Sequence, residues 1–139
     1  MRIMAIDYGD AHTGIAISDP TGFLAGFTTV ITAYRPEVVA EQITALAKEH
    51  GVEELVLGHP KNMDGTRGPR AEKAEAMAEL LKTAAGLPVV LWDERRTTID
   101  AHQILMNNGK NAKKRKKTVD AVAAALILEG YLTYKKSRG

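Results

Sequence analysis

Four acidic residues stand where carboxylates are expected to do chemistry. Asp7 and the pair Asp93 and Glu94 each follow a short apolar run, and Asp120 stands near the start of an apolar helix. Buried carboxylates that converge repel one another, and a divalent cation with oxygen ligands relieves that repulsion. Two-metal sites of this kind, with Mg²⁺ or Mn²⁺, perform in-line phosphodiester cleavage. The residue types therefore predict a metal-dependent nuclease site.

Each carboxylate also has an ordinary structural explanation. Asp120 would be favoured by the positive end of a helix dipole, and Asp7 could be a plain turn residue. Asp93 or Glu94 could pair with the neighbouring Arg95 or Arg96 on the surface. The set of acids indicates a metal site more strongly than any one of them. Strand register decides which acid of the Asp93–Glu94 pair points inward, and the sequence leaves that open.

The elements that must position these acids follow from apolar periodicity and turn residues. Strands are predicted at 3–6, 15–17, 23–31, 55–58 and 87–92, and helices at 36–50, 71–85, 97–106 and 118–134. The first two strands form a hairpin whose turn is expected to hold Gly9 and Gly14. The order predicts an antiparallel meander followed by right-handed crossovers into parallel strands, hence a mixed sheet with helices on both faces. We expect one α/β domain over residues 1–139.

The last predicted helix is expected to turn Asp120 toward the sheet. Its side chain shares a helix face with Ala124, Ile127 and Tyr131, and that face is largely apolar. In open α/β sheets, functional sites collect at the carboxyl ends of the parallel strands. Asp7 and the Asp93–Glu94 pair would both reach that edge.

The composition excludes several classes of protein. With 139 residues, of which 45% are apolar and 26% charged, the chain fits one globular domain. The lack of cysteine excludes disulfides and thiolate metal sites and is compatible with a reducing cytoplasm. No stretch approaches the roughly 18 uninterrupted apolar residues of a membrane span. We expect a cytoplasmic protein without a membrane partner.

The charge is unevenly distributed along the chain. Residues 1–100 carry 10 Lys and Arg against 15 Asp and Glu, whereas residues 101–139 carry 9 against 2. Six of the latter cations are Lys110, Lys113, Lys114, Arg115, Lys116 and Lys117. Clustered cations attract phosphates, so this run predicts nucleic-acid binding close to Asp120. The alternative is a solvated loop that only aids solubility.

Further nucleic-acid contacts are expected at the same edge of the sheet. A polar, glycine-rich loop over 61–70 carries Asn62, Arg67 and Arg70, which either contact phosphate or cap the following helix. Arg95 either contacts the scissile phosphate or supports Glu94. In the first hairpin, Gly9 would let a phosphate approach the backbone, and His12 either contacts it or is plain surface.

Four motifs carry a resemblance to a known family. They are Asp7-x-Gly9 with Gly14-Ile15-Ala16, the run Gly58 to Gly65, the run Asp93 to Thr98, and Val119-Asp120-Ala121. Together they resemble the YqgF family, whose members are described as pre-16S rRNA nucleases or Holliday junction resolvases. The motifs occur in order and span nearly the whole chain.

The resemblance implies an RNase H-like fold, with a five-stranded mixed sheet in the order 3-2-1-4-5. It also implies a cytoplasmic bacterial nuclease that matures the 5′ end of pre-16S rRNA. By family analogy Asp7, Glu94 and Asp120 would be the catalytic acids and metal ligands, which favours Glu94 over Asp93. The chain departs from the family at His12, often a basic residue, and at Thr13 and His59, where aliphatic residues are usual. These departures concern substrate contacts and leave the acidic triad intact.

Several functions are compatible with the sequence. A nuclease on precursor rRNA is favoured, and branched DNA is the alternative substrate. A non-catalytic rRNA-binding assembly factor would keep the fold and the basic run without turnover. The Asp-x-Gly hairpin also resembles the phosphate hairpin of actin-like ATPases and sugar kinases, but those proteins need two such domains and this chain supplies one. Both a monomer and a homodimer fit the sequence.

Overall fold

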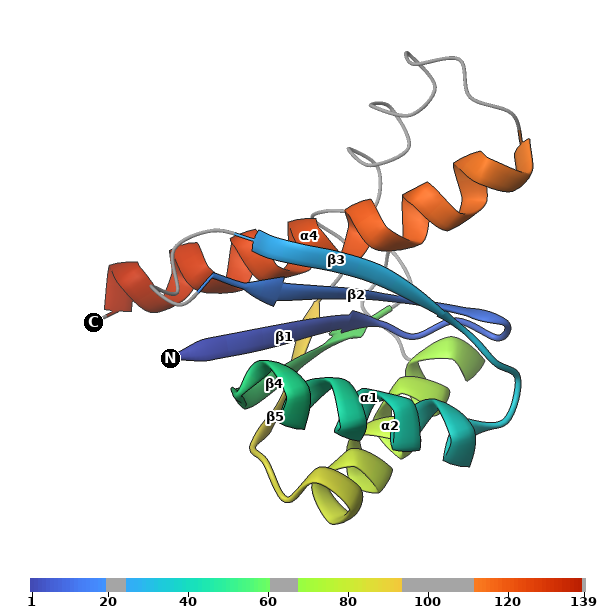
Figure 1. Ribbon diagram of the computed structural model, residues 1–139, viewed down its shortest axis with the longest axis horizontal. Coiled ribbons are helices and arrows are strands. Elements are labelled where there is room, and N and C mark those ends of the chain that lie inside the picture. Colours follow the sequence, from blue (N-terminus) through green and yellow to red (C-terminus); the bar gives the residue numbers. More distant parts are fainter. Residues whose placement is uncertain (20–24, 61–67, 94–111, 139) are drawn as a thin grey trace.

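The computed structural model describes residues 1–19, 25–60, 68–93 and 112–138. Its strands are β1 (Arg2–Asp7), β2 (His12–Ser18), β3 (Ala25–Thr32), β4 (Val52–His59) and β5 (Val89–Asp93). Its helices are α1 (Pro36–His50), α2 (Pro69–Ala85) and α4 (Ala112–Arg138). Figure 1 shows three layers, with the sheet between α4 on one face and α1 with α2 on the other.

The five strands form one sheet in the order β3-β2-β1-β4-β5. The pairs β1–β2 and β2–β3 are antiparallel, whereas β4 is parallel to both β1 and β5. The central strands consist of apolar and β-branched residues because both of their faces are covered by helices. The predicted mixed sheet, its strand order and the helices on both faces are confirmed.

Each face of the sheet has its own apolar core. In β1, Met4 and Ile6 belong to the core under α1 and α2, whereas Ile3 and Ala5 belong to the core under α4. Successive side chains of a strand point to opposite faces, so the two sets alternate. This alternation fixes the face of any residue in a strand whose neighbours are assigned.

The helices under the sheet match the predicted ranges, except that α2 begins two residues earlier, at Pro69. Pro36 and Pro69 stand in the first turns of α1 and α2, where the missing N–H costs nothing. Gly51 and Gly86 end them in the left-handed conformation, with φ of 66° and 67°. Most of their Lys and Glu residues are exposed, and most of their buried apolar residues belong to the core under the sheet.

The largest difference from the sequence-based prediction lies at the start of α4. The helix begins at Ala112, not near Thr118, so the run Lys113–Lys117 belongs to helical backbone and the expected loop is wrong. Lys and Arg are good helix formers, and no Gly or Pro interrupts residues 112–129. The helix propensity of Lys and Arg therefore explains why this polar run is helical.

Smaller differences concern the ends of strands. β4 begins at Val52, three residues earlier than predicted, and β5 is shifted to Val89–Asp93. Gly14 lies within β2, opposite Asp7, and not in the turn. The predicted helix at 97–106 and the first residues of the predicted third strand lie outside the described residues. Among the described helices, none is long and apolar enough to cross a membrane.

Candidate active site

The carboxyl ends of three parallel strands bring Asp7, His59 and Asp93 to one edge of the sheet. Ile6 of β1 is the register partner of Leu57 in β4, so Asp7 ends its strand next to the last residues of β4. His59 in turn is the register partner of Asp93 in β5. This edge is the expected position of a site in an open α/β sheet.

Asp7 and Asp93 lie on opposite faces of this edge. Asp7 is two residues after Ala5, which belongs to the α4-side core, so its side chain takes the α4 face. Asp93 follows Trp92, which packs on that same core, so Asp93 takes the α2 face. The structure thereby determines the face on which Asp93 lies, which the sequence left open.

Two glycines flank Asp7 on the α4 face. Gly14 of β2 is its antiparallel register partner, and directly opposed residues share a face. On the other side, Gly58 follows Leu57, the partner of Ile6, and is itself the partner of Trp92. The two neighbouring strands therefore place no side chain beside the Asp7 carboxylate on this face.

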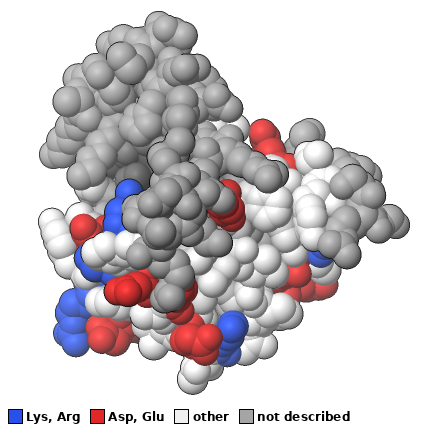
Figure 2. Space-filling model, turned by 180° about the vertical axis from the view of Figure 1, so that it is seen from behind, with Lys and Arg blue, Asp and Glu red and all other residues white. Residues whose placement is uncertain are grey.

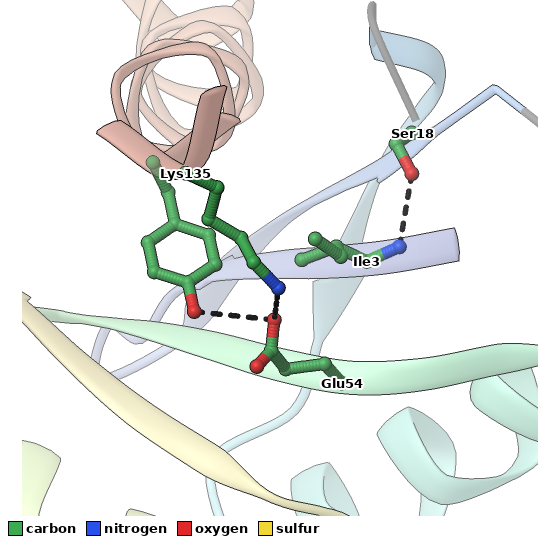
Figure 3. Close-up of polar contacts among 5 residues, drawn as sticks. Ile3, Ser18, Glu54 and Lys135 are labelled. Atoms are coloured by element: carbon green, nitrogen blue, oxygen red, sulfur yellow. Dashed lines mark hydrogen bonds and ion pairs between the residues drawn. The ribbon is translucent and has the colours of Figure 1, made fainter. Parts of the chain in front are cut away.

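Helix α4 runs along this face toward Asp7. Near its C-terminal end, Tyr131 and Lys135 donate hydrogen bonds to Glu54 Oε1 at 3.2 and 3.1 Å. Figure 3 shows Lys135 and Glu54 meeting between α4 and β4. Glu54 is the register partner of Ile3, at the opposite end of β1 from Asp7.

Helical geometry then places the backbone of residue 120. It precedes Tyr131 by eleven residues, about 16 Å of helix, while Asp7 lies four residues, about 13 Å of strand, beyond Ile3. Ala124 lies between, buried on Ala5. Ala124, Ile127 and Tyr131, the predicted inward face, are all buried, which confirms that this face packs on the sheet. The two lengths are similar, so α4 is long enough to bring the backbone of residue 120 to the edge where Asp7 stands.

On the other side of the hairpin, three predicted phosphate contacts lie together. Gly9, His12 and Arg70 line one cavity of about 220 Å³, together with Lys73 of α2. A Cβ at Gly9 would lie 2.4 Å from the carbonyl oxygen of His12, so the turn requires glycine there. The Nδ1 of His12 lies 3.4 Å from Thr32 Oγ1.

The remaining predicted site residues cannot be placed. Glu94, Asn62, Arg67, Arg95 and Lys110 lie outside the described residues. The backbone of α4 is described at Lys113, Lys114, Arg115, Lys116, Lys117 and Asp120, but their side chains are not. Within the described residues, no three His, Asp or Glu side chains gather closely enough to hold a metal ion.

One ion pair and one histidine–carboxylate hydrogen bond near this edge were not predicted. Lys73 Nζ contacts Asp10 Oδ1 at 2.9 Å and so connects α2 with the hairpin. On the α2 face, the Nε2 atom of the buried His59 lies 2.6 Å from Glu75 Oε2. Both contacts join residues that are far apart in the sequence. The only signal in the sequence is that Arg70 and Lys73 are one helical turn apart, which places both cations on the same side of α2. In Figure 2, acidic and basic groups are interspersed over the lower half of the drawn face, where Figure 1 shows the α1 and α2 layer.

Comparison with known proteins identifies the family. The family described as "RuvX: Holliday junction resolvase" matches residues 1–134. A relative from Halothermothrix orenii named "Putative pre-16S rRNA nuclease" is 46% identical over 135 residues, which cover 97% of this chain and 96% of the relative.

Solved structures support the fold. Thermus thermophilus RuvC in complex with a Holliday junction substrate matches with a TM-score of 0.65 at 14% identity, covering 99% of this chain and 96% of RuvC. The ROK hexokinase from Thermus thermophilus matches with a TM-score of 0.50 at 21% identity, covering 74% of this chain and 38% of the hexokinase. The expected RNase H-like fold is confirmed, and so is the resemblance drawn from the sequence motifs: the chain belongs to the RuvX (YqgF) nuclease family.

Proposed function

We propose that the chain is a divalent-metal-dependent nuclease whose ligands are Asp7, Glu94 and Asp120. One observation carries this proposal: the Asp7 carboxylate ends a central strand on the α4 face, between two glycine positions, at the edge that α4 reaches. Asp93 takes the other face, and the family resemblance favours Glu94, so we assign the second carboxylate to Glu94. Asp120 supplies the third from α4.

The space beside Asp7 fits a hard cation. Carboxylate oxygens are the donors that Mg²⁺ and Mn²⁺ prefer, and any larger residue at Gly14 or Gly58 would place a side chain next to the Asp7 carboxylate. Bound there, the ion would polarise the scissile phosphate and a water molecule and so supply the Lewis-acid chemistry of phosphodiester hydrolysis. Mg²⁺ is the proposed ion, and Mn²⁺ is expected to replace it.

The remaining residues of the edge are proposed to hold the substrate. Arg70 and His12 would contact a phosphate next to the one that is cleaved, and Gly9 would let the strand approach the hairpin backbone. The basic run of α4, with Arg95, Asn62, Arg67 and Lys110, would bind phosphates farther along. Because these contacts involve the sugar–phosphate backbone, they hold the substrate without reading its sequence.

Precursor 16S rRNA is the proposed substrate, with branched DNA as the second candidate. The rRNA substrate is supported by the name of the Halothermothrix orenii relative and the DNA substrate by the description of the family. Both substrates would use the same metal site. The proposed place of action is the cytoplasm, where precursor rRNA is made in bacteria.

The test compares both substrates with matched variants. Purified protein is incubated with Mg²⁺ or Mn²⁺ and either a fragment spanning the 5′ end of 16S rRNA or a four-way DNA junction, as wild type, Asp7→Asn and Asp93→Asn. We expect cleavage of the rRNA fragment by wild type and Asp93→Asn and at least a thousand-fold loss in Asp7→Asn.

Other outcomes would change the proposal. Equal cleavage by Asp7→Asn would overturn the metal mechanism. Preferred cleavage of the junction would replace RNA by branched DNA. Tight rRNA binding without any cleavage would favour a non-catalytic assembly factor, and ATP turnover without nuclease activity would favour the kinase-like alternative.

A further inference from the structure

Beside the first hairpin, a groove with two tyrosines opens on the α1 and α2 side of the sheet edge. Its volume is about 590 Å³, within the range of ligand pockets. The groove is lined by the hairpin residues Tyr8 and Asp10, by Tyr34 before α1 and Pro36 at its start, and by Lys73, Met77 and Leu80 of α2. Tyr8, Asp10 and Lys73 also line the smaller cavity that contains Gly9, His12 and Arg70, so the two spaces adjoin.

The two tyrosines are held in different ways. Tyr8 is half-buried and packs against the core under α1 and α2. Tyr34 is 76% exposed, and its segment is tied to the hairpin because the Ala33 N–H donates to the Ala11 carbonyl oxygen at 3.0 Å. Two phenol rings thus line one groove. The ring of Tyr8 is packed against the core, whereas the ring of Tyr34 is accessible to a ligand.

The charges of this region suit a single phosphate next to an apolar group. The groove itself is lined by one cation, Lys73, and two carboxylates, Asp10 and Glu79. The adjoining cavity adds Arg70 and His12. A run of phosphates would be repelled from the groove, whereas a base in the groove with its phosphate toward Arg70 would match both parts.

The groove and the proposed metal site are formed by consecutive residues of the chain. Tyr8 directly follows Asp7, and consecutive Cα atoms are about 3.8 Å apart, while their side chains take opposite faces of the edge. A strand whose phosphate lies at Asp7 on one face would therefore meet the hairpin at Gly9 and then the groove within about one nucleotide.

We infer that this groove binds one unpaired nucleotide next to the scissile phosphate, with its base on Tyr34 and Tyr8 and its phosphate toward Arg70 and His12. The inference rests on the proposed nuclease function and narrows its substrate to nucleic acid with an unpaired flank. A base within a duplex has both faces covered, so only an unpaired base can stack on a side chain. Stacking does not depend on the sugar, so both RNA and DNA strands fit.

The experiment measures binding without cleavage. Asp7→Asn protein is titrated with RNA and with DNA oligonucleotides of the same sequence, either single-stranded or as blunt duplexes, carrying 2-aminopurine at successive positions. Tyr34→Ala and Tyr34→Phe are each added to this background. Phe27→Ala serves as control, because Phe27 is also an exposed aromatic (39%) but lies on β3 opposite Ile17, at the far end of the sheet.

We expect 2-aminopurine to be quenched at one or two adjacent positions of the single strand. Tyr34→Ala should remove that quenching and weaken single-strand binding about 5-fold or more, with duplex binding unchanged, whereas Tyr34→Phe and Phe27→Ala should retain both. If Tyr34→Ala loses quenching and affinity with the RNA strand, the groove is assigned to RNA. If the loss occurs with the DNA strand alone, the groove is assigned to branched DNA.

Two results would overturn the inference. They are unchanged quenching and affinity in Tyr34→Ala, or an equal loss for single strand and duplex. Wild-type cleavage is measured separately: absence of any nuclease activity overturns the proposed function, whereas cleavage together with an unaffected Tyr34→Ala overturns the groove alone.

Discussion

The two faces of the sheet are packed in different ways. Under α1 and α2 the core consists mainly of large side chains, such as Ile6, Ile15, Leu57 and Leu81. Under α4 the sheet contributes the small residues Ala5 and Ala16, which are register partners, and the helix contributes Ala124. Small residues let the helix approach the strands closely. Small residues also occupy the edge of this face, where Gly14 and Gly58 flank Asp7.

This difference teaches where the fold gets its stability and where it leaves room for chemistry. The α1 and α2 face buries most of the large apolar side chains, so it stabilises the domain. The α4 face is held by Tyr131 and Lys135 on Glu54, at the end of β4 remote from Asp7, and by the edge-on contact of Trp92 with Tyr131, whose ring centroids are 5.7 Å apart. Next to Asp7, the neighbouring strands contribute glycines to this face.

The largest stability effect is expected on the α1 and α2 face. Leu57→Ala removes a fully buried side chain between large neighbours and should lower the free energy of unfolding by about 2–5 kcal/mol. Urea unfolding at pH 7 measures it. A loss below about 1 kcal/mol would mean that this face is not the closely packed one.

On the α4 face, replacing a small side chain by a larger one should lower the stability. Ala16→Val adds two methyl groups beneath α4 and should cost about 1–3 kcal/mol by overpacking, although valine is the better strand former. Thermal unfolding followed by circular dichroism tests this. A stabilised variant would contradict a close approach of helix and strands.

A smaller effect is expected at the end of α4 remote from Asp7. Tyr131→Phe removes the hydrogen bond to Glu54, whose other donor Lys135 remains, and should cost about 1–2 kcal/mol at pH 7. Burial, with the nearby Glu54 carboxylate, raises the pKa of Tyr131 to about 12.

The raised pKa also predicts a pH dependence. The folded state holds the phenol proton more tightly than the unfolded state, whose pKa is about 10. This contribution to stability is therefore complete below pH 10 and is lost as the pH rises through 12. Between pH 9 and 12 the unfolding free energy of wild type should fall more steeply than that of Tyr131→Phe. Parallel curves would show that the phenol does not titrate differently in the two states.

The smallest expected effect is an increase in stability. Thr13 is fully buried among the large residues of the α1 and α2 face, and its Oγ1 has no hydrogen-bond partner in the part of the chain that the structure describes. Thr13→Val replaces this hydroxyl by a methyl group and should stabilise the protein by about 1 kcal/mol. Chemical denaturation decides the sign, and a loss would indicate that the hydroxyl is satisfied in solution.

The sequence predicted what depends on local pattern. The mixed sheet, both helices under it and the inward face of α4 follow from apolar periodicity and from turn residues such as Gly51 and Gly86. The strand order was implied only by the family resemblance. It could not settle whether Asp93 faces the α4 side, because that depends on the register between β4 and β5. The Lys73–Asp10 pair and the groove at Tyr34 are contacts between distant segments, which no local pattern encodes.

The central claim is that the metal ligands lie on the α4 face of the edge, with Asp7 among them and Asp93 excluded. The direct measurement is Mn²⁺ binding by electron paramagnetic resonance, for wild type, Asp7→Asn and Asp93→Asn, each checked for folding by circular dichroism. Each substitution removes one negative charge at the carboxyl end of a parallel strand on the same edge of the sheet, so a general electrostatic effect would be similar in both. We predict that Asp93→Asn binds Mn²⁺ within about 3-fold of wild type, while Asp7→Asn loses at least about 10-fold in affinity. Unchanged binding in Asp7→Asn, or a larger loss in Asp93→Asn, would contradict the account.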